Sequence, residues 1–141
     1  MMMEAAVETY VSEAHELLEQ MERLLLQFEN GQVSDEAEDL NAIFRAAHTI
    51  KGSAGMFGLD TIVDFTHVVE NLLDKLRTGG IGLTPQLITL LLHSHDHIAL
   101  LLDAVERATQ AKRNPGVNDD NNATADLSQQ ARQRGDNLIQ A

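Results

Sequence analysis

Apolar residues recur every three or four positions along most of the chain, the spacing that gathers side chains on one face of an α-helix. The first such segment runs from Val7 to Phe28 and stops at Asn30-Gly31, a pair suited to a helix C-terminus. We therefore predict a first amphipathic helix with a single apolar face. Its apolar positions are Tyr10, Val11, Ala14, Leu17, Leu18, Met21, Leu24, Leu25 and Phe28.

A second helix is predicted after Ser34, which we expect to be its N-cap. Acidic residues at positions 35, 36 and 38 favour this start, because negative charge stabilises a helix N-terminus. The helix is expected to break at Gly58. Its apolar face consists of Leu40, Ile43, Phe44, Ala47, Ile50 and Ala54.

Two more helices follow. The third is predicted from about Asp60 to Arg77, ending at Gly79-Gly80. The fourth begins with Thr84 as N-cap and Pro85 at the first helical position, and it is Leu-rich from residue 87 to residue 105. The apolar face of the third helix consists of Ile62, Phe65, Val69, Leu72, Leu73 and Leu76.

Four amphipathic helices joined by short turns predict an all-α fold, an antiparallel four-helix bundle over residues 1–110. Residues 111–126 are rich in Asn, Asp, Pro and Gly, and we interpret them as a linker or mobile loop. Residues 127–141 have a narrow apolar edge and are predicted to form a fifth, C-terminal helix. This helix either docks on the bundle or leads to further domains.

Composition limits the possible partners and locations. The 141 residues carry a formal net charge of −12, which argues against nucleic acid and anionic lipid as partners. The chain has no cysteine, so it forms neither disulfides nor thiolate metal sites. It has no apolar run of roughly 20 residues and no signal-peptide pattern at its N-terminus. We expect a soluble cytoplasmic domain.

The candidate chemistry lies around His48. On a helix, Lys51, Gly52 and Gly55 all border this histidine. Glycine inside a helix costs roughly 1 kcal/mol relative to alanine, so two glycines beside one imidazole suggest that side-chain bulk is absent to let a partner approach. We expect the partner surface to comprise Gly52, Gly55 and Phe44.

An imidazole accepts a phosphoryl group well when one ring nitrogen is free and the other is held by a hydrogen-bond acceptor. The third helix offers Glu70 for that purpose, with His67 one turn before it. If the two helices pack antiparallel, Glu70 can face His48. We predict that Nδ1 of His48 bonds to Glu70, that Nε2 carries the phosphoryl group, and that Lys51 balances its charge.

The remaining histidines receive simpler interpretations. His15 is expected on the solvated side of the first helix. His93 and His97 are four residues apart with Asp96 nearby, a spacing that suits a metal ion. No further ligand at helical spacing completes the site, so we expect no metal there, while a metal-binding bundle remains an alternative that metal analysis would test.

Two stretches together resemble a known family. Residues 44–58, FRAAHTIKGSAGMFG, resemble the signature of histidine phosphotransfer (HPt) domains, and residues 65–74, FTHVVENLLD, are similar to the third helix of the phosphoacceptor domains of chemotaxis histidine kinases. The resemblance implies a five-helix domain built on a four-helix bundle. It also implies that His48 is phosphorylated and that Lys51, His67 and Glu70 form its polar network.

By this resemblance, His48 receives the γ-phosphoryl group of ATP from a kinase module and passes it to an aspartate of a CheY-like or CheB-like response regulator. The chain has no GxxxxGK(S/T) loop and no ATP-binding boxes. We therefore expect no cofactor in this segment. ATP and Mg²⁺ are assigned to a kinase module in cis or in trans, and Mg²⁺ also to the regulator.

The domain itself is expected to be monomeric. Two other readings stay open: a free-standing HPt protein of a multistep phosphorelay, and a non-catalytic helical docking module. Intact mass after incubation with a kinase and ATP would separate the docking module from the phosphocarriers.

Overall fold

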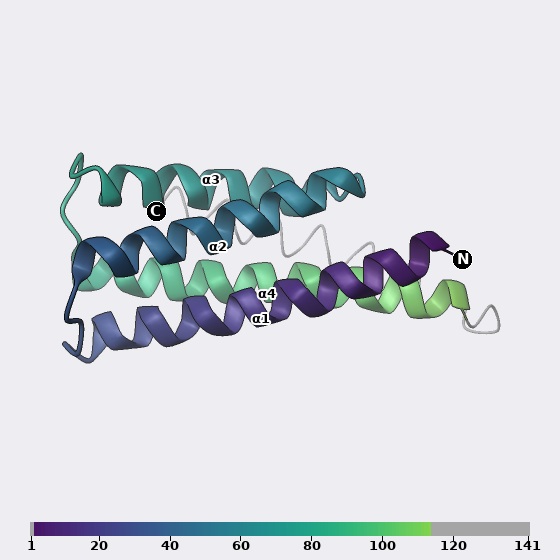
Figure 1. Ribbon diagram of the computed structural model, residues 1–141, viewed down its shortest axis with the longest axis horizontal. Coiled ribbons are helices and arrows are strands. Elements are labelled where there is room, and N and C mark those ends of the chain that lie inside the picture. The colour runs from purple at the N-terminus through teal and green to yellow at the C-terminus, as the bar shows by residue number, and fades with distance from the viewer. Residues whose placement is uncertain (1, 114–141) are drawn as a thin grey trace.

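The computed structural model describes residues 2–113, which form four α-helices (Figure 1). These are α1 (Met2–Glu29), α2 (Glu36–Met56), α3 (Asp60–Arg77) and α4 (Pro85–Arg113). The predicted all-α four-helix fold is confirmed over this range. Helix α4 continues past the predicted boundary at residue 110. Most of the predicted linker and the whole predicted helix over 127–141 lie outside the described residues.

Short connections make successive helices antiparallel and close the bundle into a ring. Helix α2 packs against α1 and α3, and α4 packs against α3 and α1. In Figure 1, α2 and α3 form the upper pair and α1 and α4 the lower pair, all along one common axis. The arrangement leaves the outer flank of the α2–α3 pair open to solvent, which is where His48 lies.

The core runs the length of the bundle and uses the apolar faces predicted from periodicity. Five of the predicted positions are only partly buried and pack against the core from its edge: Leu17, Leu24, Phe28, Phe44 and Leu72. Burying these faces removes apolar surface from water, at roughly 25 cal/mol per Å², and this is what holds four polar-surfaced helices together. The largest fully buried apolar side chains are Met21, Leu25, Ile43, Ile50, Ile62, Val69, Leu73, Leu91, Ile98, Leu101 and Leu102.

Tyr10 ties α1 to α2 through a buried hydrogen bond. Its hydroxyl donates to the backbone carbonyl of Ile50 at 3.1 Å, and the side chain is 4% exposed. Burial raises the pKa of the Tyr10 hydroxyl far above its ordinary value, so the group stays protonated and remains a donor. This bond fixes α1 behind the segment of α2 that carries Lys51.

The ends of the helices follow the sequence signals with one correction. The N-cap of α2 is Asp35 and not Ser34, because helical geometry begins one residue later and the Asp35 carboxylate then accepts the Glu38 N–H at 3.1 Å. Thr84 caps α4 as predicted, accepting the Leu87 N–H at 3.2 Å.

The turn between α2 and α3 depends on Gly58. This residue has φ of +67°, a left-handed conformation that glycine adopts without a Cβ clash. The Leu59 N–H then bonds back to the Ala54 carbonyl at 3.1 Å, and α3 starts at Asp60. So tight a reversal places α3 directly beside α2 and brings their outer flanks together.

Candidate functional site

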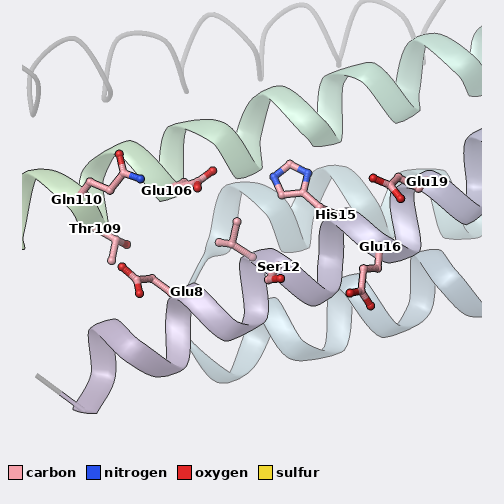
Figure 2. Close-up of a pocket in the computed structure, with 9 residues that line it drawn as sticks. Glu8, Ser12, His15, Glu16, Glu19, Glu106, Thr109 and Gln110 are labelled. Carbon is pink, nitrogen blue, oxygen red and sulfur yellow. The ribbon is translucent and has the colours of Figure 1, made fainter.

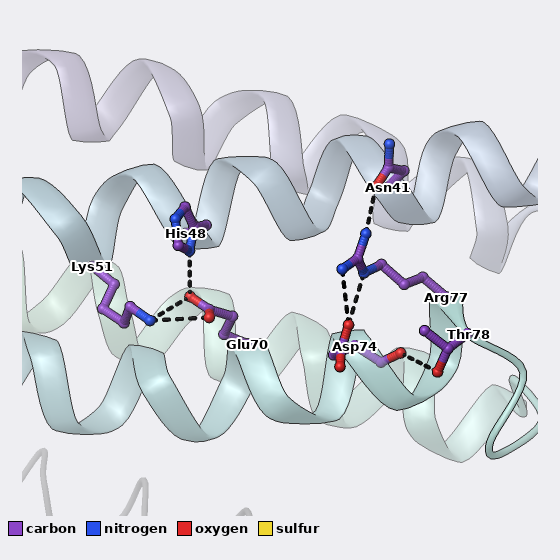
Figure 3. A network of polar contacts seen from close by, with 7 residues as sticks. All are labelled: Asn41, His48, Lys51, Glu70, Asp74, Arg77 and Thr78. Carbon is purple, nitrogen blue, oxygen red and sulfur yellow. Dashed lines mark hydrogen bonds and ion pairs between the residues drawn. The ribbon is translucent and has the colours of Figure 1, made fainter.

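His48 and Glu70 meet across the interface between α2 and α3. Nδ1 of His48 lies 3.0 Å from Oε2 of Glu70. The two side chains point toward each other in Figure 3. The His48 side chain is 60% exposed, whereas the Glu70 side chain is only 13% exposed. The predicted contact is thus present, with an accessible ring held by a largely buried carboxylate.

Lys51 completes a three-residue polar group. Its Nζ lies 3.0 Å from Oε1 and 2.9 Å from Oε2 of Glu70. Burial raises the pKa of Glu70, but the hydrogen bonds and charges of Lys51 and His48 outweigh it and lower that pKa below the ordinary value. Glu70 is therefore ionised at neutral pH and accepts from both neighbours.

The Glu70 contact determines which nitrogen of the neutral His48 ring is free. An ionised carboxylate can only accept hydrogen bonds, so Nδ1 must be the nitrogen that donates. In a neutral imidazole the other nitrogen then has its lone pair available. Nε2 of His48 is accordingly the ring nitrogen with a free lone pair, on a ring that is mostly exposed to solvent.

Next to His48, two positions on the surface of α2 are glycines and carry no projecting side chain. Gly52 and Gly55 are both exposed on α2. A Cβ added at Gly52 would meet no atom within 4 Å, and one at Gly55 would meet only Cγ2 of Val63 at 4.0 Å. Packing within the bundle therefore does not require glycine at either position.

Phe44 lies one turn before His48 and stacks on it. The two ring planes are 13° apart, with ring centroids at 6.1 Å. The guanidinium of Arg77 lies over the Phe44 ring, 3.8 Å from the centroid of that ring. Arg77 donates in turn to Asp74 at 2.9 Å and to Asn41 at 3.1 Å, and these contacts are drawn beside the His48 group in Figure 3.

Sequence reasoning did not find Asn41, Asp74 or Arg77. A signal was available, because Asn41 and His48 are seven residues apart on α2, and Glu70 and Arg77 are seven apart on α3. Residues at that spacing share a helix flank. The two flanks that meet at His48 and Glu70 therefore meet again one to two turns away.

His67 does not join the group around Glu70. It is exposed on α3, one turn before Glu70. Within the described part of the chain it forms no hydrogen bond or ion pair with His48, Lys51 or Glu70. The structure thus brings together three of the four residues predicted for the network, and a role for His67 remains a prediction.

The histidines of α4 lie in different environments. His93 is exposed, whereas His97 is 5% exposed and its ring packs on Phe65 with centroids 4.3 Å apart. These two side chains therefore do not face a common site. His95, which the periodicity did not single out, is 7% exposed and its Nδ1 lies 3.0 Å from Asp96 Oδ1.

His15 borders a cleft of about 540 Å³ between α1 and α4 (Figure 2). Its Nε2 lies 3.6 Å from Asp103, so it is less solvated than expected. Its side chain, with those of Asp103 and Glu106, offers atoms that could hold a metal ion, as do Glu22, His95 and Asp96. The cleft lining is Glu8, Val11, Ser12, His15, Glu16, Glu19, Glu106, Thr109 and Gln110.

None of the helices described between residues 2 and 113 is long and apolar enough to cross a membrane.

The fold and the site together define a class of protein. The sequence matches the Hpt domain family over residues 5–111, which span all four described helices and the His48 group. The chain belongs to the Hpt domain family.

Among curated proteins, the chain is similar to the chemotaxis protein CheA of Salmonella typhimurium. The two are 45% identical over 103 residues, which cover 73% of this chain and 15% of that protein. It is also 36% identical over 110 residues to the sensor histidine kinase CheAY of Helicobacter pylori, covering 78% of this chain and 13% of that one. The chain thus spans only about a seventh of these relatives.

A solved structure shares the fold. The phosphorylated P1 domain of CheA3 from R. sphaeroides, crystallised in complex with CheY6, superposes with a TM-score of 0.66 at 23% sequence identity. The match covers 93% of this chain and 98% of that one.

Proposed function

We propose that this domain is the phosphoacceptor of a chemotaxis histidine kinase, with His48 as the residue that carries the phosphoryl group. The observation that carries the proposal is the 3.0 Å contact between Nδ1 of His48 and Glu70 on a ring that is 60% exposed. Such an arrangement orients an imidazole and leaves Nε2 accessible, which a docking surface alone does not need.

In the proposed step, Nε2 attacks the γ-phosphorus of ATP. A nitrogen–phosphorus bond forms, the bond from phosphorus to the leaving oxygen of ADP breaks, and the ring gains positive charge. Glu70 stabilises that charge through the proton on Nδ1, and a charge-assisted hydrogen bond of this kind contributes roughly 1.5–3 kcal/mol. Lys51, held at the same carboxylate, offsets the negative charge of the phosphoryl group.

The phosphoryl group is then transferred to an aspartate on the receiver domain of a CheY-like or CheB-like response regulator. For direct transfer, that carboxylate must come within about 3–3.5 Å of the phosphorus, so the two backbones must approach closely. The exposed Gly52 and Gly55 beside His48 allow such an approach, and Phe44 borders the same surface. The likeness to a P1 domain crystallised with CheY6 supports this choice of partner.

We assign ATP binding and its Mg²⁺ to a separate kinase module, on the same polypeptide or on another. The curated relatives support this assignment, since they include a protein named as a sensor histidine kinase and are about seven times as long as the segment matched. The domain contributes the acceptor group and acts in the cytoplasm, where ATP is available.

The test is a labelling experiment with the kinase module of a CheA relative and ATP labelled at the γ-phosphate. Wild type should gain one acid-labile phosphoryl group, and His48→Gln should gain none while keeping its helical circular dichroism. His93→Gln is the matched control, because His93 is another exposed helical histidine, on α4. No labelling of wild type by an active kinase would favour the docking module, and full labelling of His48→Gln would move the acceptor elsewhere.

A further inference from the structure

Two polar groups on the α2–α3 flank are joined by one aromatic ring. The first is His48 with Glu70 and Lys51, and the second is Arg77 with Asp74 and Asn41; no dashed contact connects the two groups in Figure 3. Phe44 lies between them. One contact of its ring is the His48 imidazole, 13° from parallel, and another is the Arg77 guanidinium at 3.8 Å.

The hydrogen bond to Glu70 constrains one distance, whereas the imidazole moves through two side-chain torsions, χ1 and χ2. A concerted change in the two torsions can keep the distance from Nδ1 to Oε2 while tilting the ring plane and displacing Nε2. A nearly parallel aromatic neighbour restricts this change, because offset stacking is favoured with centroids between about 4.5 and 7 Å. The 6.1 Å contact with Phe44 therefore supplies the second constraint on Nε2.

Phe44 packs against the edge of the core but is only partly buried, so the core alone does not hold its ring on every side. Arg77 provides a further support. Its planar guanidinium suits an aromatic face better than the compact ammonium of a lysine. Asp74 accepts from Nε at 2.9 Å and lies 2.9 Å from Nη2, while Asn41 accepts from Nη1 at 3.1 Å, so the plane of Arg77 is itself fixed.

We propose that Arg77 is a positioning residue for phosphoryl transfer at His48, acting through Phe44: the clamped guanidinium holds the Phe44 ring, and that ring sets the plane of the imidazole. The proposal rests on the proposed function for its kinetic consequence, although the stacking itself can be tested without any phosphoryl chemistry.

A direct electrostatic role for Arg77 fits the structure less well. Two of its nitrogens lie 2.9 Å from one Asp74 oxygen, so its charge is already paired. Glu70, not Arg77, is the charged group bonded to the imidazole.

The first test measures the surroundings of the His48 ring directly. We compare the ring-proton NMR shifts of His48 in unphosphorylated wild type, Arg77→Ala, Arg77→Lys and Phe44→Leu. Arg77→Ala should move these shifts toward the Phe44→Leu values, and Arg77→Lys should move them less. Arg45→Ala is the charge-matched control, because Arg45 is exposed on α2 and pairs only loosely with Glu38 at 3.7 Å. Unchanged His48 shifts in Arg77→Ala would overturn the proposal, whether or not His48 is phosphorylated.

The second test is a double-mutant cycle on the single-turnover rate of phosphoryl transfer from the labelled domain to a CheY-like receiver. Arg77→Ala should slow transfer by roughly tenfold, in line with the sensitivity of positioned reactions to small displacements. In a Phe44→Leu background the same change should have almost no further effect, because the two residues act in series. An equal slowing in both backgrounds would contradict action through Phe44 and assign Arg77 to the partner surface. Failure of wild type to become labelled would count against the proposed function instead.

Discussion

Nδ1 of His48 and Oε2 of Glu70 lie 3.0 Å apart, one on each of two helices joined by the tight turn at Gly58. The same carboxylate also holds Lys51. A single, largely buried acidic group thereby controls the tautomer of the ring and the position of the nearest positive charge.

Replacing Glu70 with alanine should slow phosphorylation of His48 by roughly ten- to a hundredfold, since a charge-assisted bond contributes about 1.5–3 kcal/mol and each 1.36 kcal/mol is a factor of ten in rate. Stopped-flow or quench measurements with excess kinase module would give the rate. Asn71→Ala, the adjacent exposed position on α3, is the control and should react at the wild-type rate. Unchanged kinetics in Glu70→Ala would remove that residue from the mechanism.

Substitutions of Gly52 should raise the stability of the domain while lowering its rate of phosphoryl transfer. Because a Cβ at Gly52 meets no atom within 4 Å, Gly52→Ala and Gly52→Gln should both fit and should stabilise α2 by up to about 1 kcal/mol. Urea unfolding would measure this gain. Transfer to a receiver domain should be impaired strongly by glutamine and only slightly by alanine, since only the longer side chain fills the approach path.

If Gly52→Gln is more stable and transfers as fast as wild type, the exposed strip beside His48 is not where the receiver docks. The matched alanine variant distinguishes an effect of helix flexibility from an effect of steric access. Equal slowing by alanine and glutamine would point to helix flexibility and not to steric access.

Lowering the pH should remove the contribution of Glu70 to the free energy of unfolding. Its pKa in the folded domain is lowered, because Lys51 and His48 outweigh the effect of burial, whereas in the unfolded chain it is about 4.3. The unfolded state therefore binds the proton more readily, and the stabilisation is fully present above about pH 4.3 and is lost as pH falls through the folded value.

Glu70→Gln keeps the size of the side chain without its charge. The free energy of unfolding of wild type minus that of this variant should be largest near neutral pH and should shrink below about pH 4.3. Urea titrations across this range would measure the difference. A difference that stays constant into acid would mean that the Glu70 charge does not stabilise the fold.

Tyr10→Phe tests whether the core behind the site can be weakened without loss of chemistry. Loss of the 3.1 Å bond from the hydroxyl to the Ile50 carbonyl should cost about 1 kcal/mol. That carbonyl lies inside α2 and keeps its helical partner, so no buried acceptor is left unpaired. The variant should unfold at lower urea concentration and be phosphorylated at the wild-type rate. A large rate loss would show that α1 controls the geometry of His48.

The helices and most of their buried positions could be predicted from periodicity, because each helix has one apolar stripe and four such stripes are buried together in a bundle. The cap of α2 was predicted one residue early. Ser34 and Asp35 are both good N-caps, and only the backbone geometry decides which one reaches the Glu38 N–H.

The contact between His48 and Glu70 was predictable once α2 and α3 were taken as antiparallel neighbours. The position of Arg77 was not predicted, since its place over Phe44 depends on the register and spacing of two helices, which a sequence pattern does not specify. The burial of His95 and His97 was also not predicted, because only the leucines were taken to mark the buried face of this helix.

The most direct test of the account is the NMR assignment of the phosphorylated ring in ¹⁵N-histidine-labelled protein. The geometry predicts phosphorus on Nε2 of His48, with the proton retained on Nδ1 and bonded to Glu70. The ¹⁵N shifts and the nitrogen–phosphorus couplings distinguish the two ring nitrogens and the individual histidines. Phosphorus on Nδ1 of His48, or on any other histidine, would contradict the central claim.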